Sequence, residues 1–147
     1  MIKIASHHFE SELKYNRRKL WKLCKKHDLR LVILHGSRVL GKLHKESDID
    51  IGILAESGSL GKRIFEMQAD FTDLFGERCD LVVLNNAESM IVYQVAVKGA
   101  VLYESRKGLF AGYKTTAITR YQDARKFRDL ERKYLQDVIG RMDEHDR

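Results

Sequence analysis

HGSRVLGKLHKESDID, residues 35–50, contains a Gly-Ser pair and, ten residues later, two aspartates separated by one residue. The apolar run LRLVIL precedes the pair and the run IGIL follows the aspartates, which predicts two buried strands connected by this stretch. Successive side chains of a strand alternate between its faces, so we expect Asp48 and Asp50 to project to the same side.

Two carboxylates at this spacing repel each other, and a divalent cation between them relieves the repulsion. Hard oxygen ligands of this kind suit Mg²⁺, which commonly takes one or two carboxylates together with substrate phosphates. Upstream, Gly36 and Ser37 offer backbone N–H groups and a hydroxyl at a strand end, and Arg38 adds a positive charge. The stretch therefore predicts a phosphate grip facing a metal site.

A simpler interpretation is a turn followed by a strand whose aspartates face water. Against it, Asp50 lies inside the apolar run IDIGIL, where an unpaired carboxylate costs several kcal/mol. Asp80 opens another β-prone run, DLVVL, and converges with Asp48 and Asp50 if the two strands are neighbours. Taken alone, Asp80 is better explained as a strand-entry residue. For His35 we favour a packed histidine at a strand end over a phosphate contact.

The composition is that of an ordinary globular chain of 147 residues, 44% hydrophobic and 33% charged. No apolar run is long enough to span a membrane, and the first residues lack the apolar core of a secretory signal. Cys24 and Cys79 fit no metal-binding spacing, so we expect buried reduced thiols and a cytoplasmic protein.

Charge is distributed unevenly along the chain. Residues 1–30 carry nine Lys/Arg against three Asp/Glu, residues 31–103 seven against ten, and residues 104–147 eleven against eight. The basic first segment has apolar residues at helical spacing, which favours a solvated helix face. The alternative is that this segment binds an anionic surface of a partner. Nucleic acid is an unlikely direct partner.

The coarse pattern alternates between helix and strand. We expect helices at about 9–27, 60–75 and 87–98, the third capped by Asn86, and a long amphipathic helix at about 111–142 after a loop containing Gly108 and Gly112. We expect strands at 29–36, 48–55, 78–86 and 100–105. The pattern predicts an α/β (α+β) fold with a mixed sheet of about four strands, the aspartates on one face and helices on the other.

The motif resembles that of the polymerase-β-like nucleotidyltransferases. Gly36-Ser37, ten residues, Asp48-x-Asp50 and a later strand aspartate form the signature of that superfamily, and GSRVLG followed by SDIDIGIL is similar to its minimal members (MNT). The MNT proteins paired with HEPN-type toxins are the nearest in pattern, since they too have a long C-terminal helix. The resemblance implies one nucleotidyltransferase domain over residues 1–147, with a core at about 28–105 and a helical segment at about 110–145.

The resemblance also implies roles for single residues. Gly36, Ser37 and Arg38 would hold the phosphates of ATP, and Asp48, Asp50 and Asp80 would bind Mg²⁺ and act in catalysis. The acceptor would be a tyrosine hydroxyl of a partner HEPN ribonuclease toxin, which AMP transfer would silence. Members of the family often have a second arginine in the glycine loop, where this chain has Leu40.

Two other functions remain open. A small-molecule nucleotidyltransferase of the aminoglycoside type usually has an additional acidic domain, whereas the C-terminal segment here is basic. An antitoxin that neutralises its toxin by binding alone needs no intact set of aspartates. The leading expectation is AMP transfer to a partner protein.

Overall fold

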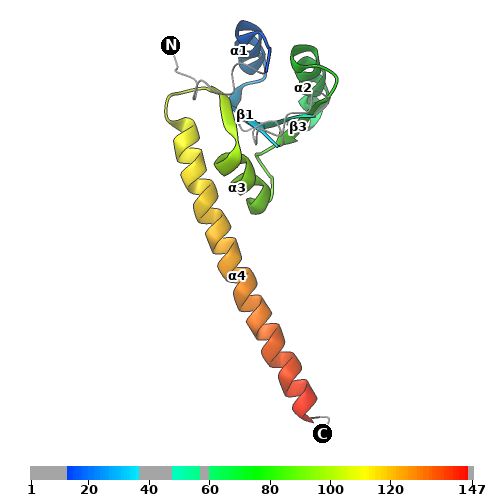
Figure 1. Cartoon of the computed structure of the whole chain (residues 1–147), viewed down its shortest axis with the longest axis vertical. Coiled ribbons are helices and arrows are strands. Elements are labelled where there is room, and N and C mark those ends of the chain that lie inside the picture. Colours follow the sequence, from blue (N-terminus) through cyan, green and yellow to red (C-terminus); the bar gives the residue numbers. More distant parts are fainter. Residues whose placement is uncertain (1–12, 37–47, 57–59, 146–147) are drawn as a thin grey trace.

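The computed structural model of the chain describes residues 13–36, 48–56 and 60–145. A four-stranded sheet lies between two layers of helices, and one long helix projects away from it (Figure 1). The elements in chain order are α1 (Arg17–Lys26), β1 (Leu29–His35), β2 (Ile49–Ala55), α2 (Leu60–Phe75), β3 (Cys79–Val83), α3 (Ser89–Lys98), β4 (Ala100–Glu104) and α4 (Leu109–His145).

The strands are ordered β3-β2-β1-β4. Strand β1 is antiparallel to both of its neighbours, whereas β2 and β3 run parallel. A parallel pair needs a crossover connection, and α2 provides it between β2 and β3. The predicted mixed sheet with flanking helices and a long C-terminal helix is therefore confirmed.

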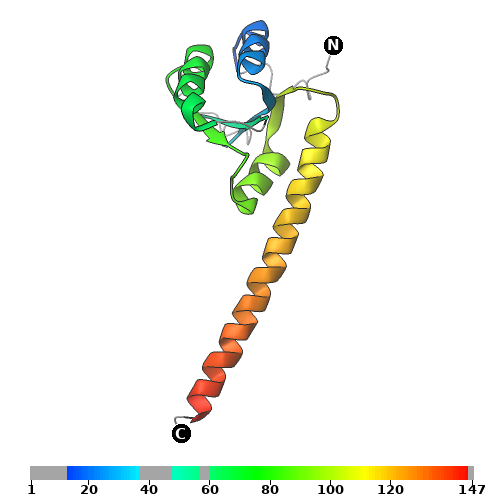
Figure 2. The same ribbon diagram turned by 180° about the vertical axis from the view of Figure 1, so that it is seen from behind.

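Helices cover both faces of the sheet, so the expectation of helices on one face only was wrong. Ile51 and Ile53 pack with Met67 and Phe71 of α2 on one face, and α1 covers the same side. On the other face, α3 and the first turns of α4 pack over the sheet (Figure 2). The central strands β1 and β2 are apolar on both sides, and an exposed apolar face would be costly.

Gly52 allows α3 to lie close to the sheet. A Cβ atom at this position would be 3.0 Å from Val95 Cγ1 of α3 and 3.2 Å from Leu84 Cδ1. Gly52 lies on the same face as Asp50, two residues away along β2. The glycine thus brings α3 onto the face of β2 that carries Asp50.

Three predicted element boundaries were wrong, each because of a local hydrogen bond. Helix α1 begins at Arg17 rather than near residue 9, since the Asn16 side chain accepts a hydrogen bond from the Lys19 N–H at 3.1 Å. The first residues of the predicted helix, 9–12, lie outside the described residues. Asn86 does not cap α3, because it belongs to a turn closed by the Ala87 N–H on the Leu84 carbonyl.

Gly112, expected in a loop, lies inside α4. The helix begins early because the Glu104 carboxylate accepts hydrogen bonds from its first N–H groups, at 3.0 Å from Phe110 and 3.4 Å from Gly108. A carboxylate at this end also interacts favourably with the helix dipole. Strand β4 and helix α4 are thereby joined by a short, fixed connection.

The two cysteines are free and buried, as predicted. Burial, more than the neighbouring Asp80 and Asp50, raises the pKa of the Cys79 thiol to about 11. Within residues 13–36, 48–56 and 60–145, no helix combines the length and the apolarity needed to cross a bilayer.

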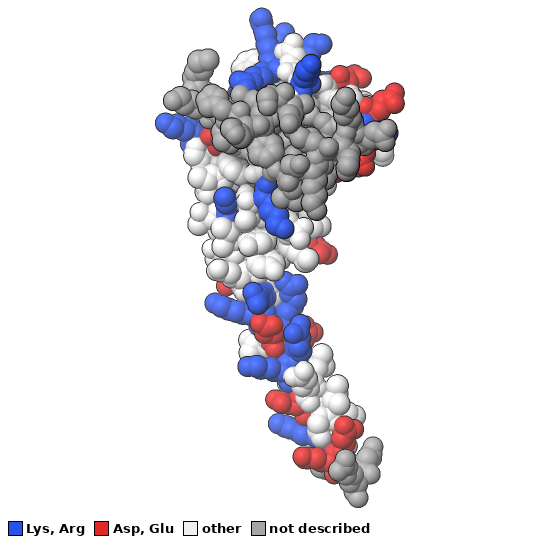
Figure 3. All heavy atoms as spheres, in the orientation of Figure 1, with Lys and Arg blue, Asp and Glu red and all other residues white. Residues whose placement is uncertain are grey.

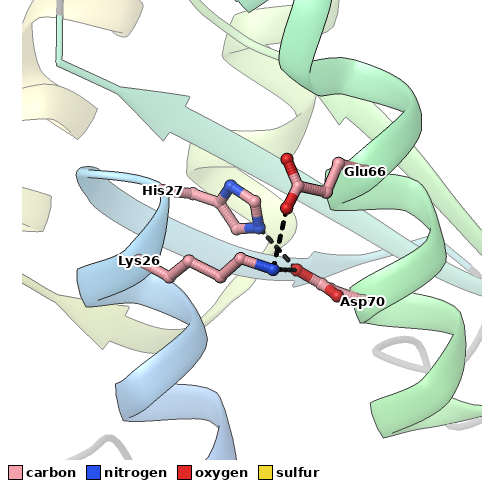
Figure 4. Close-up of polar contacts among 4 residues, drawn as sticks. All are labelled: Lys26, His27, Glu66 and Asp70. Carbon is pink, nitrogen blue, oxygen red and sulfur yellow. Dashed lines mark hydrogen bonds and ion pairs between the residues drawn. The ribbon is translucent and has the colours of Figure 1, made fainter.

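A polar cluster ties α1 to α2. Asp70 of α2 accepts from Lys26 Nζ at 2.8 Å and lies 2.7 Å from the Nε2 atom of the buried His27, and Glu66 lies 2.9 Å from the same Lys26 (Figure 4). Burial alone would raise the pKa of Asp70, but the hydrogen bonds from Lys26 and His27 outweigh it and lower that pKa. Asp70 therefore stabilises the fold in its ionised form.

We predict that Asp70→Asn destabilises the protein only where the carboxyl is ionised. Because its folded pKa is lowered, the stabilisation is present above the ordinary carboxyl pKa of about 4 and is lost as the pH falls through the folded pKa. The free energy of unfolding should drop by about 1–2 kcal/mol at pH 6, and the difference from the wild type should be smaller at pH 3. Denaturant titration measures both values.

The matched control is Asp73→Asn, an exposed aspartate on the same helix, which should change stability little at either pH. An equal loss at pH 6 and pH 3 for Asp70→Asn would contradict an electrostatic role for this cluster.

Candidate active site

Three polar side chains form a row across the adjacent strands β1, β2 and β3. The antiparallel register pairs His35 of β1 with Asp50 of β2, and the parallel register pairs Asp50 with Asp80 of β3. Residues paired in register project to the same face. The expected proximity of Asp50 and Asp80 on neighbouring strands is therefore present in the structure.

Asp48 completes the acidic group from just before β2. It is exposed, two residues ahead of Asp50, and its charge acts on Asp50. Asp80 is likewise exposed, whereas Asp50 is partly buried. The three carboxylates thus gather where β2 and β3 begin, with Asp50 as the innermost.

Burial and the neighbouring negative charges both raise the pKa of Asp50. Burial is the largest cause of its raised pKa, His35 opposes the shift, and Asp80 and Asp48 add to it. The pKa of His35 is lowered, mainly by burial and against the influence of Asp50. The site therefore concentrates negative charge that the neutral imidazole does not balance.

Gly36 follows His35 and leaves room for the Asp50 carboxylate. Its φ of +81° lies in the left-handed region, which favours glycine. A Cβ at this position would overlap the carboxylate oxygen Asp50 Oδ2 and lie 3.0 Å from Asp50 Cγ. The backbone at the end of β1 therefore comes directly against the acidic group, and only glycine permits that approach.

Ser37 and Arg38, the other predicted phosphate ligands, lie outside the described residues. Among the residues that are described, no group of three or more His, Cys, Asp and Glu side chains is arranged as a complete metal site. The donor chemistry nevertheless fits Mg²⁺, because this ion prefers carboxylate oxygens, retains waters and completes its shell with substrate phosphates. Asp48, Asp50 and Asp80 are the residues that would hold it.

His35 is the strand-end histidine that the sequence predicts, but its alignment with Asp50 was not foreseen. Its Nε2 atom is buried without a hydrogen-bond partner among the described residues, and its side chain stands beside Asp50 on the acidic face. The available signal was its place directly before the glycine turn. The strand register that brings it to Asp50 is a tertiary feature that the pattern of residues does not contain.

Comparison with protein families matches residues 18–108 to the model described as polymerase beta, nucleotidyltransferase. A solved toxin–antitoxin structure with AMP-PNP is 27% identical, with a TM-score of 0.67, and the match covers 84% of this chain and 98% of that one. Comparison with curated proteins found no significant match.

Two further solved structures share the fold. One contains the tri-AMPylated Shewanella oneidensis HEPN toxin in complex with MNT antitoxin, at 25% identity and a TM-score of 0.62, covering 84% of this chain and 95% of that one. The other is the toxin–antitoxin MntA–HepT, at 24% identity and a TM-score of 0.61, covering 84% and 96%. The resemblance drawn from the sequence motif is confirmed.

We predict that Asp50→Asn stabilises the metal-free protein at neutral pH. Because the folded pKa of Asp50 is raised, its ionised form costs stability above that pKa, and the cost disappears as the pH falls and the carboxyl takes up a proton. With EDTA at pH 7.5, the melting temperature should rise by about 2–4 °C, the equivalent of about 1 kcal/mol. The gain should shrink on acidification.

With Mg²⁺ and ATP added, the wild type should have a higher melting temperature than Asp50→Asn, since a ligand that binds only the folded wild type raises its melting temperature by mass action. Asp73→Asn serves as the control in both titrations. A wild type that gains the same shift from ATP with EDTA as from ATP with Mg²⁺ would contradict a metal site here.

Proposed function

The chain belongs to the polymerase beta nucleotidyltransferase family, and from this membership we propose that it transfers AMP from ATP to a tyrosine hydroxyl of a partner HEPN-type toxin and thereby acts as an antitoxin. The observation that carries the proposal is the strand register, which aligns Asp50 with Asp80. The backbone at Gly36 lies so close to the Asp50 carboxylate that only glycine fits there. A purely structural strand pair has no need of two adjacent carboxylates.

The proposed reaction is an in-line displacement at phosphorus. The acceptor oxygen forms a bond to the α-phosphorus of ATP, the bond from that phosphorus to the oxygen bridging the β-phosphate breaks, and pyrophosphate leaves. Asp80, the more exposed of the paired carboxylates, would accept the hydroxyl proton. Held by the three aspartates, Mg²⁺ would neutralise charge on the attacking and leaving oxygens.

The glycine turn would serve the triphosphate. Gly36 adds no side chain of its own at the end of β1, and Ser37 and Arg38 follow directly in the sequence. Phosphates placed here would lie against the Asp50 carboxylate, which is a repulsive arrangement without a cation between them. The geometry thus favours a nucleotide that arrives with its metal ion.

The projecting part of α4 would bind the toxin. Beyond Tyr121, which stacks on Tyr93 of α3 with ring centroids 4.2 Å apart, the helix leaves the rest of the protein. Phe127, Leu130 and Tyr134 are 76%, 64% and 68% exposed. Uncharged atoms gather along one side of this segment, between charged ones (Figure 3).

We call Phe127, Leu130, Tyr134 and Val138, which lie along one side of the helix, the α4 apolar stripe. Phe127, Leu130 and Tyr134 are exposed, so the small sheet does not cover the whole helix. Exposed apolar stripes of this size mark binding surfaces. Two of the solved structures that match 84% of this chain are toxin–antitoxin structures, which supports a toxin as the occupant.

This surface also supports the competing proposal that the protein neutralises its toxin by contact alone. The two proposals differ in whether the aspartates are needed. They are separable because the acidic site and the α4 apolar stripe lie on different parts of the molecule.

We predict that the double substitution Asp48→Ala, Asp50→Ala abolishes neutralisation while the protein stays folded. Removing the carboxylates relieves repulsion, so stability should not fall, but AMP transfer should drop by at least about a thousandfold. Co-expression with the toxin should then fail to rescue growth, while Ser37→Ala should rescue in part because it removes one hydrogen bond. Growth and labelled-AMP incorporation are the two measurements.

Full rescue of growth by the double variant, folded but unable to transfer AMP, would instead support neutralisation by contact alone.

We predict that Leu130→Glu weakens toxin binding by at least about tenfold without changing the melting temperature. A charge in the middle of the α4 apolar stripe disfavours burial against a partner, while an exposed site tolerates it in the free protein. The matched control is Gln136→Glu, which adds the same charge on the opposite side of the helix. Equal loss of binding for both variants, measured by titration calorimetry, would contradict this surface assignment.

A further inference from the structure

A basic cleft lies at the end of the sheet away from the acidic site. Its volume is about 630 Å³, within the range of small-molecule pockets. Four cationic side chains line it, and the described lining contains no carboxylate: Arg30 from β1, Arg106 and Lys107 from the turn before α4, and Arg120 from α4. Such a concentration of positive charge is costly unless an anion is nearby.

The cations are only weakly neutralised by the protein itself. Arg30 lies 3.7 Å from Glu56 through its Nε atom, a long and exposed ion pair. Within the described residues, Arg106, Lys107 and Arg120 form no ion pair. The nearby Glu104 carboxylate is already hydrogen-bonded to the N–H groups at the start of α4.

Tyr113 adds a polar group without a partner. It lines the same cleft, and its hydroxyl oxygen is buried with no hydrogen bond among the described residues. Burial, partly offset by Arg120, raises its pKa to about 12, so the phenol is neutral and retains a proton to donate. Buried hydroxyls without partners are rare, and a ligand oxygen would satisfy this one.

The cleft is separate from the acidic site although both lie on one face of the sheet. Leu54, which lines the cleft, is four residues beyond Asp50 on β2, or about 13 Å along the strand. Helix α3 packs on Gly52 between them. A nucleotide held by the glycine turn at Gly36 therefore does not account for the cations of the cleft.

We propose that this cleft is a second, non-catalytic binding site for a small phosphorylated ligand, of nucleotide or pyrophosphate size. Three of the four cations are arginines, whose planar guanidinium groups bind phosphate oxygens in pairs. Leu54, Leu109 and the Tyr113 ring supply an apolar wall for the remainder of the ligand. The inference is independent of the AMP-transfer proposal, since it uses none of the acidic residues.

The test uses the full-length protein, inorganic pyrophosphate as the probe, and EDTA to remove divalent ions from the acidic site. Titration followed by amide NMR should shift the signals of Gly108, Gly112 and Thr116 and leave Asp50 and Asp80 unchanged. The charge reversal Arg106→Glu with Arg120→Glu should weaken binding at least tenfold. Lys126→Glu with Arg128→Glu, the same charge change on the exposed part of α4, should weaken it less than twofold.

Four results would overturn the proposal. Signal changes confined to Asp50 and its neighbours would place the probe in the acidic site. Equal binding of citrate, or an equal loss for both charge-reversal pairs, would show a general attraction of anions rather than a phosphate site. Single-stranded RNA that binds more tightly than pyrophosphate, and loses affinity in the Lys126 and Arg128 pair as well, would indicate an extended nucleic-acid surface instead.

A separate variant distinguishes loss of binding from a folding defect. Tyr113→Phe keeps the ring packing and removes only the unpartnered hydroxyl, so its melting temperature should not fall. Pyrophosphate affinity should decrease about three- to tenfold. Unchanged affinity would remove Tyr113 from the site and contradict the proposal at that position.

Discussion

The pairing of two carboxylates across the parallel strands β2 and β3 is the constraint on which the rest of the structure depends. The register holds Asp50 beside Asp80, with Asp48 close enough to act on the same carboxyl group. Like charges at neighbouring strand positions destabilise a sheet. The fold compensates elsewhere, with central strands that are apolar on both faces and helical layers that bury them.

The same constraint explains the local features around the site. The end of β1 must approach the Asp50 carboxylate, so a glycine follows His35. Helix α3 must pack beside the acidic row, so β2 contains Gly52 two residues further on. Each glycine removes a side chain where chemistry or packing needs close contact, and each lies within an otherwise apolar strand or at its end.

Much of this arrangement was predictable from the residues. The strand positions follow from runs of apolar residues, and the shared face of Asp48 and Asp50 follows from strand alternation. The partnership with Asp80 was conditional on the neighbouring order of two strands, which the local pattern does not contain. The role of α3 on the acidic face and the alignment of His35 with Asp50 are also tertiary, and both were missed.

The boundary errors have a similar origin. The basic segment before residue 17 has helical periodicity, but the Asn16 side chain begins the helix where it can cap the Lys19 N–H. Asn86 has good capping chemistry yet is used in a turn. Propensity thus identified the elements, and individual hydrogen bonds determined where they begin.

The central proposal is that the protein uses Asp48, Asp50 and Asp80 to transfer AMP to a protein partner. The intact mass of that partner tests it most directly. The HEPN-type toxin is incubated with this protein, ATP and Mg²⁺, and its intact mass is then measured by mass spectrometry. We expect a gain of one or more AMP units with the wild type and with Asp73→Asn, and none with Asp50→Asn. An unchanged toxin mass in a complex that still forms with the wild type would contradict it.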